Sequence, residues 1–131
     1  MMSDNNLLLL ALKLNAMFSG FSAFCLIAAG NWLAVQFALE SALSIYLVAG
    51  CLAVFALLLA NIVRTKNIRT WEITGIIIGD IAWVVASVVL VVLFYKSITT
   101  TALVLVDLVA IVVLFFAVMQ IRGLKQYRTT R

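Results

Sequence analysis

The sequence predicts an all-α membrane protein, a four-transmembrane-helix antiparallel bundle with cytoplasmic N- and C-termini. Of the 131 residues, 66% are hydrophobic and 11% are charged, and the mean hydropathy is +1.25. A soluble domain is roughly half apolar and about a quarter charged, and one of this size has too little interior to bury so much apolar surface. The apolar residues also form four continuous runs, and the basic residues gather on one side of them.

The four runs have the length that a membrane crossing requires. A helix rises ~1.5 Å per residue, so about 20 apolar residues cross a ~30 Å hydrocarbon core. Backbone groups inside lipid must be satisfied within the segment, and the runs are continuous rather than alternating, which favours helices over a strand barrel. We expect one membrane domain, residues 1–131, with spans at about 7–29, 43–63, 73–95 and 102–121.

Polar breaks and one apolar segment connect the spans. Residues 64–70 and 96–101 are short polar connections, so the helices they join are expected to form antiparallel hairpins. Residues 31–40 are mostly apolar but too short to cross. Because Trp32, Val35 and Leu39 share a helical face, we predict an interfacial turn or short helix there.

The basic residues orient the chain. Eight lie on the side of the termini and only Lys96 lies on the other, which by the positive-inside rule predicts cytoplasmic termini. Residues beside the membrane are expected to contact lipid headgroups rather than nucleic acid. A docking tail for an acidic partner or lipid is the alternative role for the basic residues after the fourth span. The eight residues are Lys13, Arg64, Lys66, Arg69, Arg122, Lys125, Arg128 and Arg131.

Small and polar residues line one side of the third span. A face of this kind suits contact with protein, and an opposite β-branched face suits lipid. Gly75 and Gly79 form a GxxxG motif, which predicts close approach of a neighbouring helix. The predicted inward face is Glu72, Gly75, Gly79, Asp80, Trp83, Ala86 and Ser87, and the predicted lipid face is Ile73, Ile77, Ile78, Ile81, Val84, Val85, Val88 and Val92.

The other three spans carry similar stripes. Four stripes of small or polar residues facing inward predict a compact bundle, with the alanines of the second span in helix packing. The stripes are Asn15, Phe18, Ser19 and Ser22 in the first span, Ala49, Ala53, Ala56 and Ala60 in the second, and Asp107, Ala110, Leu114 and Ala117 in the fourth.

Two carboxylates fall inside spans. An Asp near the centre of a span costs roughly 2.5–3.5 kcal/mol on insertion scales, so Asp80 and Asp107 should be protonated, paired or exposed to water. Counted from the nearer interface, Asp80 lies ~13 Å deep and Asp107 ~9–12 Å deep from the opposite side. In a ~30 Å core their predicted axial separation is roughly 5–8 Å, close enough to face each other.

The first span offers Asp80 competing partners. Asn15 and Lys13 differ by ~200° around the helix, so they cannot both face the same neighbour. We favour Asn15 inward, because Ser19 agrees with it, and Lys13 reaching to the headgroups. If Lys13 turns inward instead, it could neutralise Asp80.

Two interpretations of the candidate polar site stay open. In one, Asp80 forms an interhelical clamp with Asn15, Ser87 or the Trp83 indole. In the other, the intramembrane acids form a proton or cation site. The chain has no histidine, and its two cysteines form no CxxC pair, so we expect no cofactor, no metal and no catalytic relay.

Two stretches carry a resemblance to a known group. Leu14–Gly20 and Gly79–Trp83 resemble segments of small four-span bacterial integral membrane proteins of unknown function, which implies a bacterial inner (plasma) membrane setting. The small multidrug resistance transporters are similar in size and span count, but they carry a glutamate in the first span, where this chain has Lys13 and Asn15.

The first functional hypothesis is a non-enzymatic structural, accessory or partner-binding bundle, with the lipid bilayer and a second copy or another membrane protein as partners. The alternative is a small oligomeric proton- or cation-coupled transporter that uses Asp80 and Asp107. The first hypothesis expects Asp80→Asn to be tolerated and Gly79→Leu to disrupt assembly.

Overall fold

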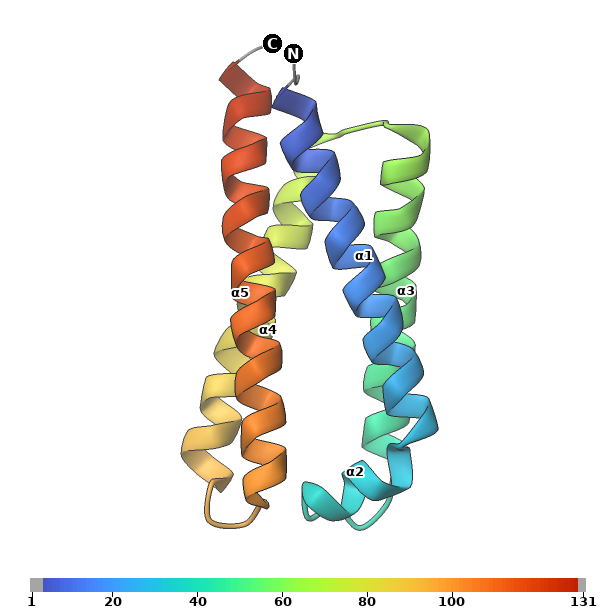
Figure 1. Ribbon diagram of the computed structural model, residues 1–131, viewed down its shortest axis with the longest axis vertical. Helices are drawn as coiled ribbons and strands as arrows, with labels where there is room; N and C mark the ends of the chain where they lie inside the picture. Colours follow the sequence, from blue (N-terminus) through green and yellow to red (C-terminus); the bar gives the residue numbers. More distant parts are fainter. Residues whose placement is uncertain (1–3, 130–131) are drawn as a thin grey trace.

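The computed structural model describes residues 4–129, with side chains from residue 7 onward. In that part of the chain, helices joined by short connections are the only regular secondary structure (Figure 1). Four of its helices are long and apolar enough to cross a membrane, in agreement with the predicted four spans. The helices are α1 (Asp4–Ala28), α2 (Gly30–Gln36), α3 (Leu43–Thr65), α4 (Thr70–Phe94) and α5 (Thr100–Thr129).

The long helices form two pairs. Helix α1 packs along α3, α4 packs along α5, and α1 and α5 join the pairs. Figure 1 shows α1 and α5 close together where α1 begins and α5 ends, and diverging toward the other end. The expected hairpin of α3 and α4 is corrected in part: the two helices are antiparallel, but their backbones do not pack, because residues 66–69 carry the chain sideways between the pairs.

The main apolar core lies at the end where α1 begins. There α1, α3, α4 and α5 each contribute buried side chains, so this is the level at which the pairs are held together. Elsewhere large apolar side chains are exposed on every long helix, as expected of helices that face lipid. The core cluster is Leu8, Leu12, Leu59, Ile62, Ile73, Ile76, Ile77 and Leu124.

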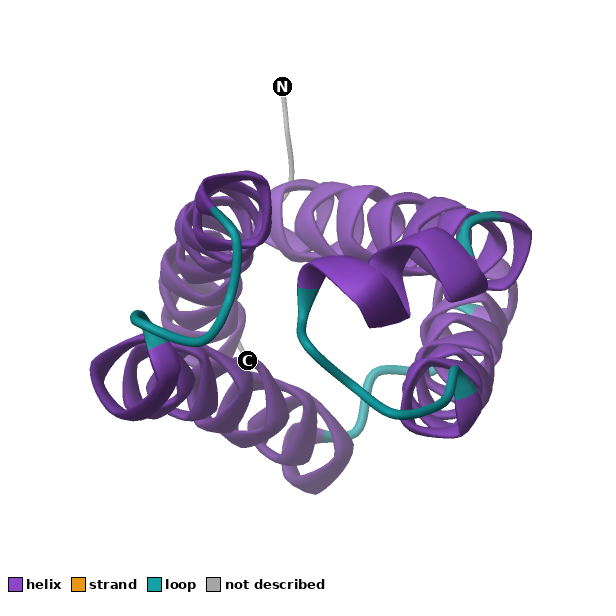
Figure 2. Cartoon of the chain, turned by 90° about the horizontal axis from the view of Figure 1, so that it is seen from below, coloured by secondary structure: helices purple, strands orange, loops and turns teal. Residues whose placement is uncertain are grey.

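Helix α2 covers the opposite end of the bundle, which Figure 2 shows from below. It buries Leu33 and Ala34 against the bundle and leaves Trp32 and Val35 exposed on its outer side. The short helix predicted within residues 31–40 is therefore present, and its exposed Trp32 suits an interfacial position.

The helix ends have local causes. Helix α3 stops at Lys66, which adopts a left-handed conformation (φ 55°) and donates its backbone N–H to the Ile62 carbonyl at 2.8 Å. Helix α5 begins at Thr100, and the hydroxyl of the preceding Thr99 caps it by accepting the Ala102 N–H at 3.1 Å. It continues to Thr129, past the predicted span end at Ile121, since its basic residues are good helix formers and favour a helix C-terminus.

Helix α4 is rotated about its axis relative to the predicted orientation. Ile73, Ile76 and Ile77 are buried with Asp80, whereas Gly75 and Gly79 are exposed. The predicted inward face is therefore right for Asp80 but wrong for Gly75 and Gly79, and Ile73 and Ile77, predicted to face lipid, lie inside. Asp80 belongs to the same i, i+3, i+4, i+7 stripe as the isoleucines, and burying it brings them inward.

Candidate functional site

Three helices meet at one buried polar level. Asp80 of α4 is 4% exposed, Asn15 of α1 is 1% exposed and Gln120 of α5 is fully buried. On each helix, an apolar residue three or four positions away shares the face of the polar residue and belongs to the core cluster. The fold therefore brings one polar group from each of three helices into an otherwise apolar interior.

The three side chains form a closed hydrogen-bonded triangle. The Asn15 amide donates to Asp80 Oδ2 at 2.8 Å and to Gln120 Oε1 at 3.0 Å. The Gln120 amide donates to the same Asp80 Oδ2 at 2.7 Å. Ser19 extends the network, since its hydroxyl donates to Asn15 Oδ1 at 3.2 Å. We call these four residues the Asp80 network.

The Asp80 network satisfies its own polar groups. Within the described residues, no buried side-chain nitrogen or oxygen lacks a hydrogen-bond partner. A groove between α4 and α5 and another between α1 and α3 are lined by other residues. The described part of the chain holds no group of three or more His, Cys, Asp or Glu that could bind a metal. Chemically, the arrangement is a clamp that links α1, α4 and α5.

Two orientations of α1 were predicted as alternatives, and the structure has the one with Asn15 inward. Asn15 faces the bundle with Ser19, and Lys13 is exposed. Lys13 therefore does not contact Asp80, as the ~200° difference around the helix requires once Asn15 is inward.

Ser87 and Trp83, predicted as possible partners of Asp80, bond elsewhere. The Ser87 hydroxyl donates to the backbone carbonyl of Trp83 at 2.8 Å, a bond within α4 itself. Both side chains are half-buried, and the hydrogen bonds of Asp80 come from Asn15 and Gln120.

Asp107 does not face Asp80, contrary to the prediction. The hydrogen bonds of Asp80 come from Asn15 and Gln120. Gln120 lies 13 positions after Asp107 on α5, so the two residues point to different sides of that helix. Asp107 is also exposed, on the flank of α5 rather than inside.

Gln120 is the site residue that sequence reasoning missed. It follows Ala117 by three positions, so it continues the predicted inward stripe of the fourth span. It is also an uncharged polar residue near the end of a long apolar run. Its place on the stripe and its polarity together could have identified it as an interior polar residue.

The helices approach each other closely at small residues other than Gly75 and Gly79, where close packing was predicted. A Cβ added at Gly75 would meet nothing within 4 Å, and one at Gly79 only Phe55 Cε1 at 3.9 Å. A Cβ at Gly123 would lie 2.8 Å from Leu8 Cα, so α1 and α5 approach closely there. Gly79→Leu is therefore no longer expected to disrupt packing within the chain.

The alanine seam of α3 faces α1. Ala49 is fully buried, and Ala53, Ala56 and Ala60 line a shallow groove between the two helices. A Cβ at Gly20 of α1 would be 3.8 Å from Ala56 Cβ, so small residues of both helices lie opposite each other.

Most basic residues belong to the α3–α4 connection and to the last turns of α5, and Figure 1 shows both segments at the end where α1 begins. Lys96 follows α4 at the other end, with its Nζ above the Tyr95 ring. Arg69 forms an ion pair with Glu72 at 3.8 Å. Arg131 is outside the described residues. The predicted headgroup residues Arg64, Lys66, Arg69, Arg122, Lys125 and Arg128 are all exposed.

Comparison with protein-family models finds no match, and comparisons with curated proteins and with solved structures find none either.

Proposed function

We propose that this protein is a non-enzymatic, partner-binding bundle of the bacterial inner membrane, crossing it four times with its termini in the cytoplasm. The partner is a transmembrane helix, from a second copy of the chain or from another membrane protein. The contact surface is the flank of α5 that carries Asp107, which we call the Asp107 flank. It consists of Val104, Asp107, Ile111 and Leu114.

The exposure of Asp107 carries this proposal. Its neighbours on the same helical face are apolar and open to the surroundings; Ile111, one turn away, is 65% exposed. An ionised Asp facing lipid costs roughly 2.5–3.5 kcal/mol near the centre of a span. A partner helix with a hydrogen-bond donor at this depth would remove that cost, which makes association favourable there.

The Asp80 network supports a structural role for the interior rather than transport. A transport acid must exchange a proton or cation with water, whereas Asp80 is 4% exposed and accepts bonds from two amides. The proposed orientation is supported by the basic residues, since Lys66, Lys125 and other exposed cations lie at the end shared by the first and last helices.

Site-specific photo-crosslinking in native membranes tests the partner surface. A benzophenone amino acid replaces Ile111 on the Asp107 flank, and in a control replaces Leu57, which is exposed on α3. We expect a discrete product from position 111 and none of comparable yield from position 57. Asp107→Leu should reduce that product several-fold, and Asp107→Asn, which retains hydrogen-bonding groups, should largely preserve it.

The mass of the product identifies the partner: twice the chain mass indicates a second copy, and any other mass indicates a different protein. A product whose yield is the same in Asp107→Leu, or no discrete product at position 111, would contradict the proposal. The rival transport function is tested in proteoliposomes. A proton or cation flux that Asp80→Asn or Asp107→Asn abolishes would replace the present proposal.

A further inference from the structure

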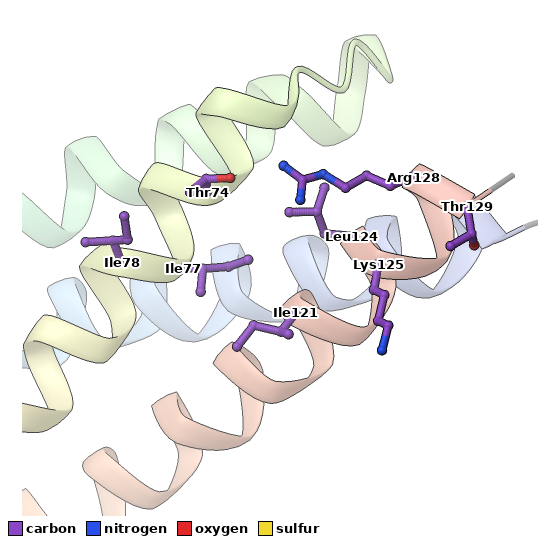
Figure 3. Close-up of a pocket in the computed structure, with 8 residues that line it drawn as sticks. All are labelled: Thr74, Ile77, Ile78, Ile121, Leu124, Lys125, Arg128 and Thr129. Carbon is purple, nitrogen blue, oxygen red and sulfur yellow. The ribbon is translucent and has the colours of Figure 1, made fainter. Parts of the chain in front are cut away.

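A groove runs between α4 and α5 near the end of α5, with a volume of about 510 Å³ (Figure 3). Its apolar lining comes from both helices and lies on the side of the bilayer interior, and its polar lining lies toward the helix end. The apolar residues are Ile77, Ile78, Ile121 and Leu124, and the polar residues are Thr74, Lys125, Arg128 and Thr129.

The polar end of the groove brings a cation and a hydroxyl together from different helices. In Figure 3 the guanidinium of Arg128, on α5, extends toward the Thr74 hydroxyl on α4, while Lys125 extends along the other side of α5. A guanidinium recognises phosphate oxygens through paired N–H groups, and a hydroxyl adds a further donor. This end of the groove therefore suits a phosphate group.

The two cations are available for such a ligand. Among the side chains that the structure describes, neither Lys125 nor Arg128 has an ion-pair partner, whereas Arg69 is paired with Glu72. Gly123, two residues before Lys125, holds α5 against α1, and its neighbour Leu124 is in the core cluster. The cations are thus on a helix turn whose position is fixed by packing.

We propose that this groove binds one anionic phospholipid from the leaflet at this end of the molecule. The phosphate lies between Arg128 and the Thr74 hydroxyl with Lys125 adding charge, and an acyl chain lies along Ile77, Ile78 and Ile121. The apolar lining favours a phospholipid over free phosphate, since only a lipid fills both halves of the groove. Basic pockets between transmembrane helices bind acidic lipid headgroups by the same combination.

Lipid binding by delipidated protein in a neutral detergent tests the proposal by native mass spectrometry. Dioleoyl phosphatidylglycerol and dioleoyl phosphatidylcholine carry the same chains, so their difference reports on the headgroup. We expect the first phosphatidylglycerol to bind at least tenfold more tightly. Arg128→Gln should weaken it about fivefold, since the phosphate loses its guanidinium partner, and this corresponds to ~1 kcal/mol. Lys125→Gln should weaken it less, since Lys125 extends along the other side of α5.

Arg122→Gln is the matched control, because Arg122 is exposed on the same helix and does not line the groove. It should leave the preference for phosphatidylglycerol unchanged. Ile121→Trp narrows the apolar half and should weaken both lipids without changing their ratio. The helical content of every variant is measured by circular dichroism, and binding is compared between folded samples.

Three outcomes would overturn the proposal. Equal affinity for the two lipids would show no anionic site, and an equal loss in Arg122→Gln would show a diffuse charge effect. Displacement of phosphatidylglycerol by equimolar inorganic phosphate would show a phosphate site without a lipid groove. The proposal is independent of the partner surface, since Lys125 lies 18 positions from Asp107, roughly 27 Å along α5. Asp107→Leu should therefore leave lipid binding intact.

Discussion

Asp80 and Gln120, 40 residues apart in the chain, are joined by a 2.7 Å hydrogen bond between α4 and α5. Both side chains are buried, and Asn15 of α1 donates to each of them. This bond fixes the register of the α4–α5 hairpin, because a shift of one residue would place Gln120 on another face of α5.

Replacing Gln120 with leucine should destabilise the bundle by about 1–3 kcal/mol, since a buried acceptor on Asp80 loses a donor. Unfolding by a denaturing detergent in mixed micelles measures this cost. The double variant Asp80→Leu/Gln120→Leu should lose less than the sum of the two single changes, because no unpaired carboxylate remains. Strictly additive losses would show that the bond contributes no coupling.

Asn15 and Lys13 provide a matched pair on α1. Asn15→Leu removes the residue that bonds Asp80, Gln120 and Ser19, and should cost about 1–3 kcal/mol in the same assay. Lys13→Leu changes an exposed position and should cost less than about 0.5 kcal/mol. Similar losses for the two variants would contradict the assignment of Asn15 to the interior.

The spans and the inward face of α1 were predictable because length and hydropathy directly express the cost of placing backbone and polar groups in lipid. Ser19, one turn from Asn15, favoured that face of α1 over the one that carries Lys13. The seam at Ala49, Ala53 and Ala56 was visible for the same reason, since small residues allow two helices to approach.

The orientation of α4 and the location of Asp107 were not predictable in this way. Gly75 and Gly79 satisfy a packing motif, but exposure costs a glycine little, so the need to bury Asp80 decides the rotation. Asp107 points outward because the bond between Asp80 and Gln120 determines which face of α5 points inward. That bond depends on tertiary contacts of α5 with two helices, and spacing within one segment does not encode it.

Two glycines should respond oppositely to alanine. Gly123→Ala places a Cβ 2.8 Å from the Leu8 Cα, so α1 and α5 must separate, at a cost of about 1–3 kcal/mol. Gly75→Ala meets no atom within 4 Å and should stabilise α4 by roughly 0.5–1 kcal/mol. Detergent-induced unfolding of both variants checks the pair. A larger loss for Gly75→Ala would indicate that a partner covers that face.

Thr99 should stabilise the end of the bundle opposite the termini. Its hydroxyl caps α5 and donates to Gln36 Oε1 at 2.8 Å, and its backbone N–H donates to the Gln36 carbonyl at 3.1 Å. Thr99→Val removes the cap and the side-chain bond, and should cost about 0.5–2 kcal/mol. Hydrogen exchange should accelerate in the first turn of α5 and at the end of α2. Thr101→Val, at an exposed position, is the control, and equal exchange in the two variants would show that Thr99 does not hold α2 against α5.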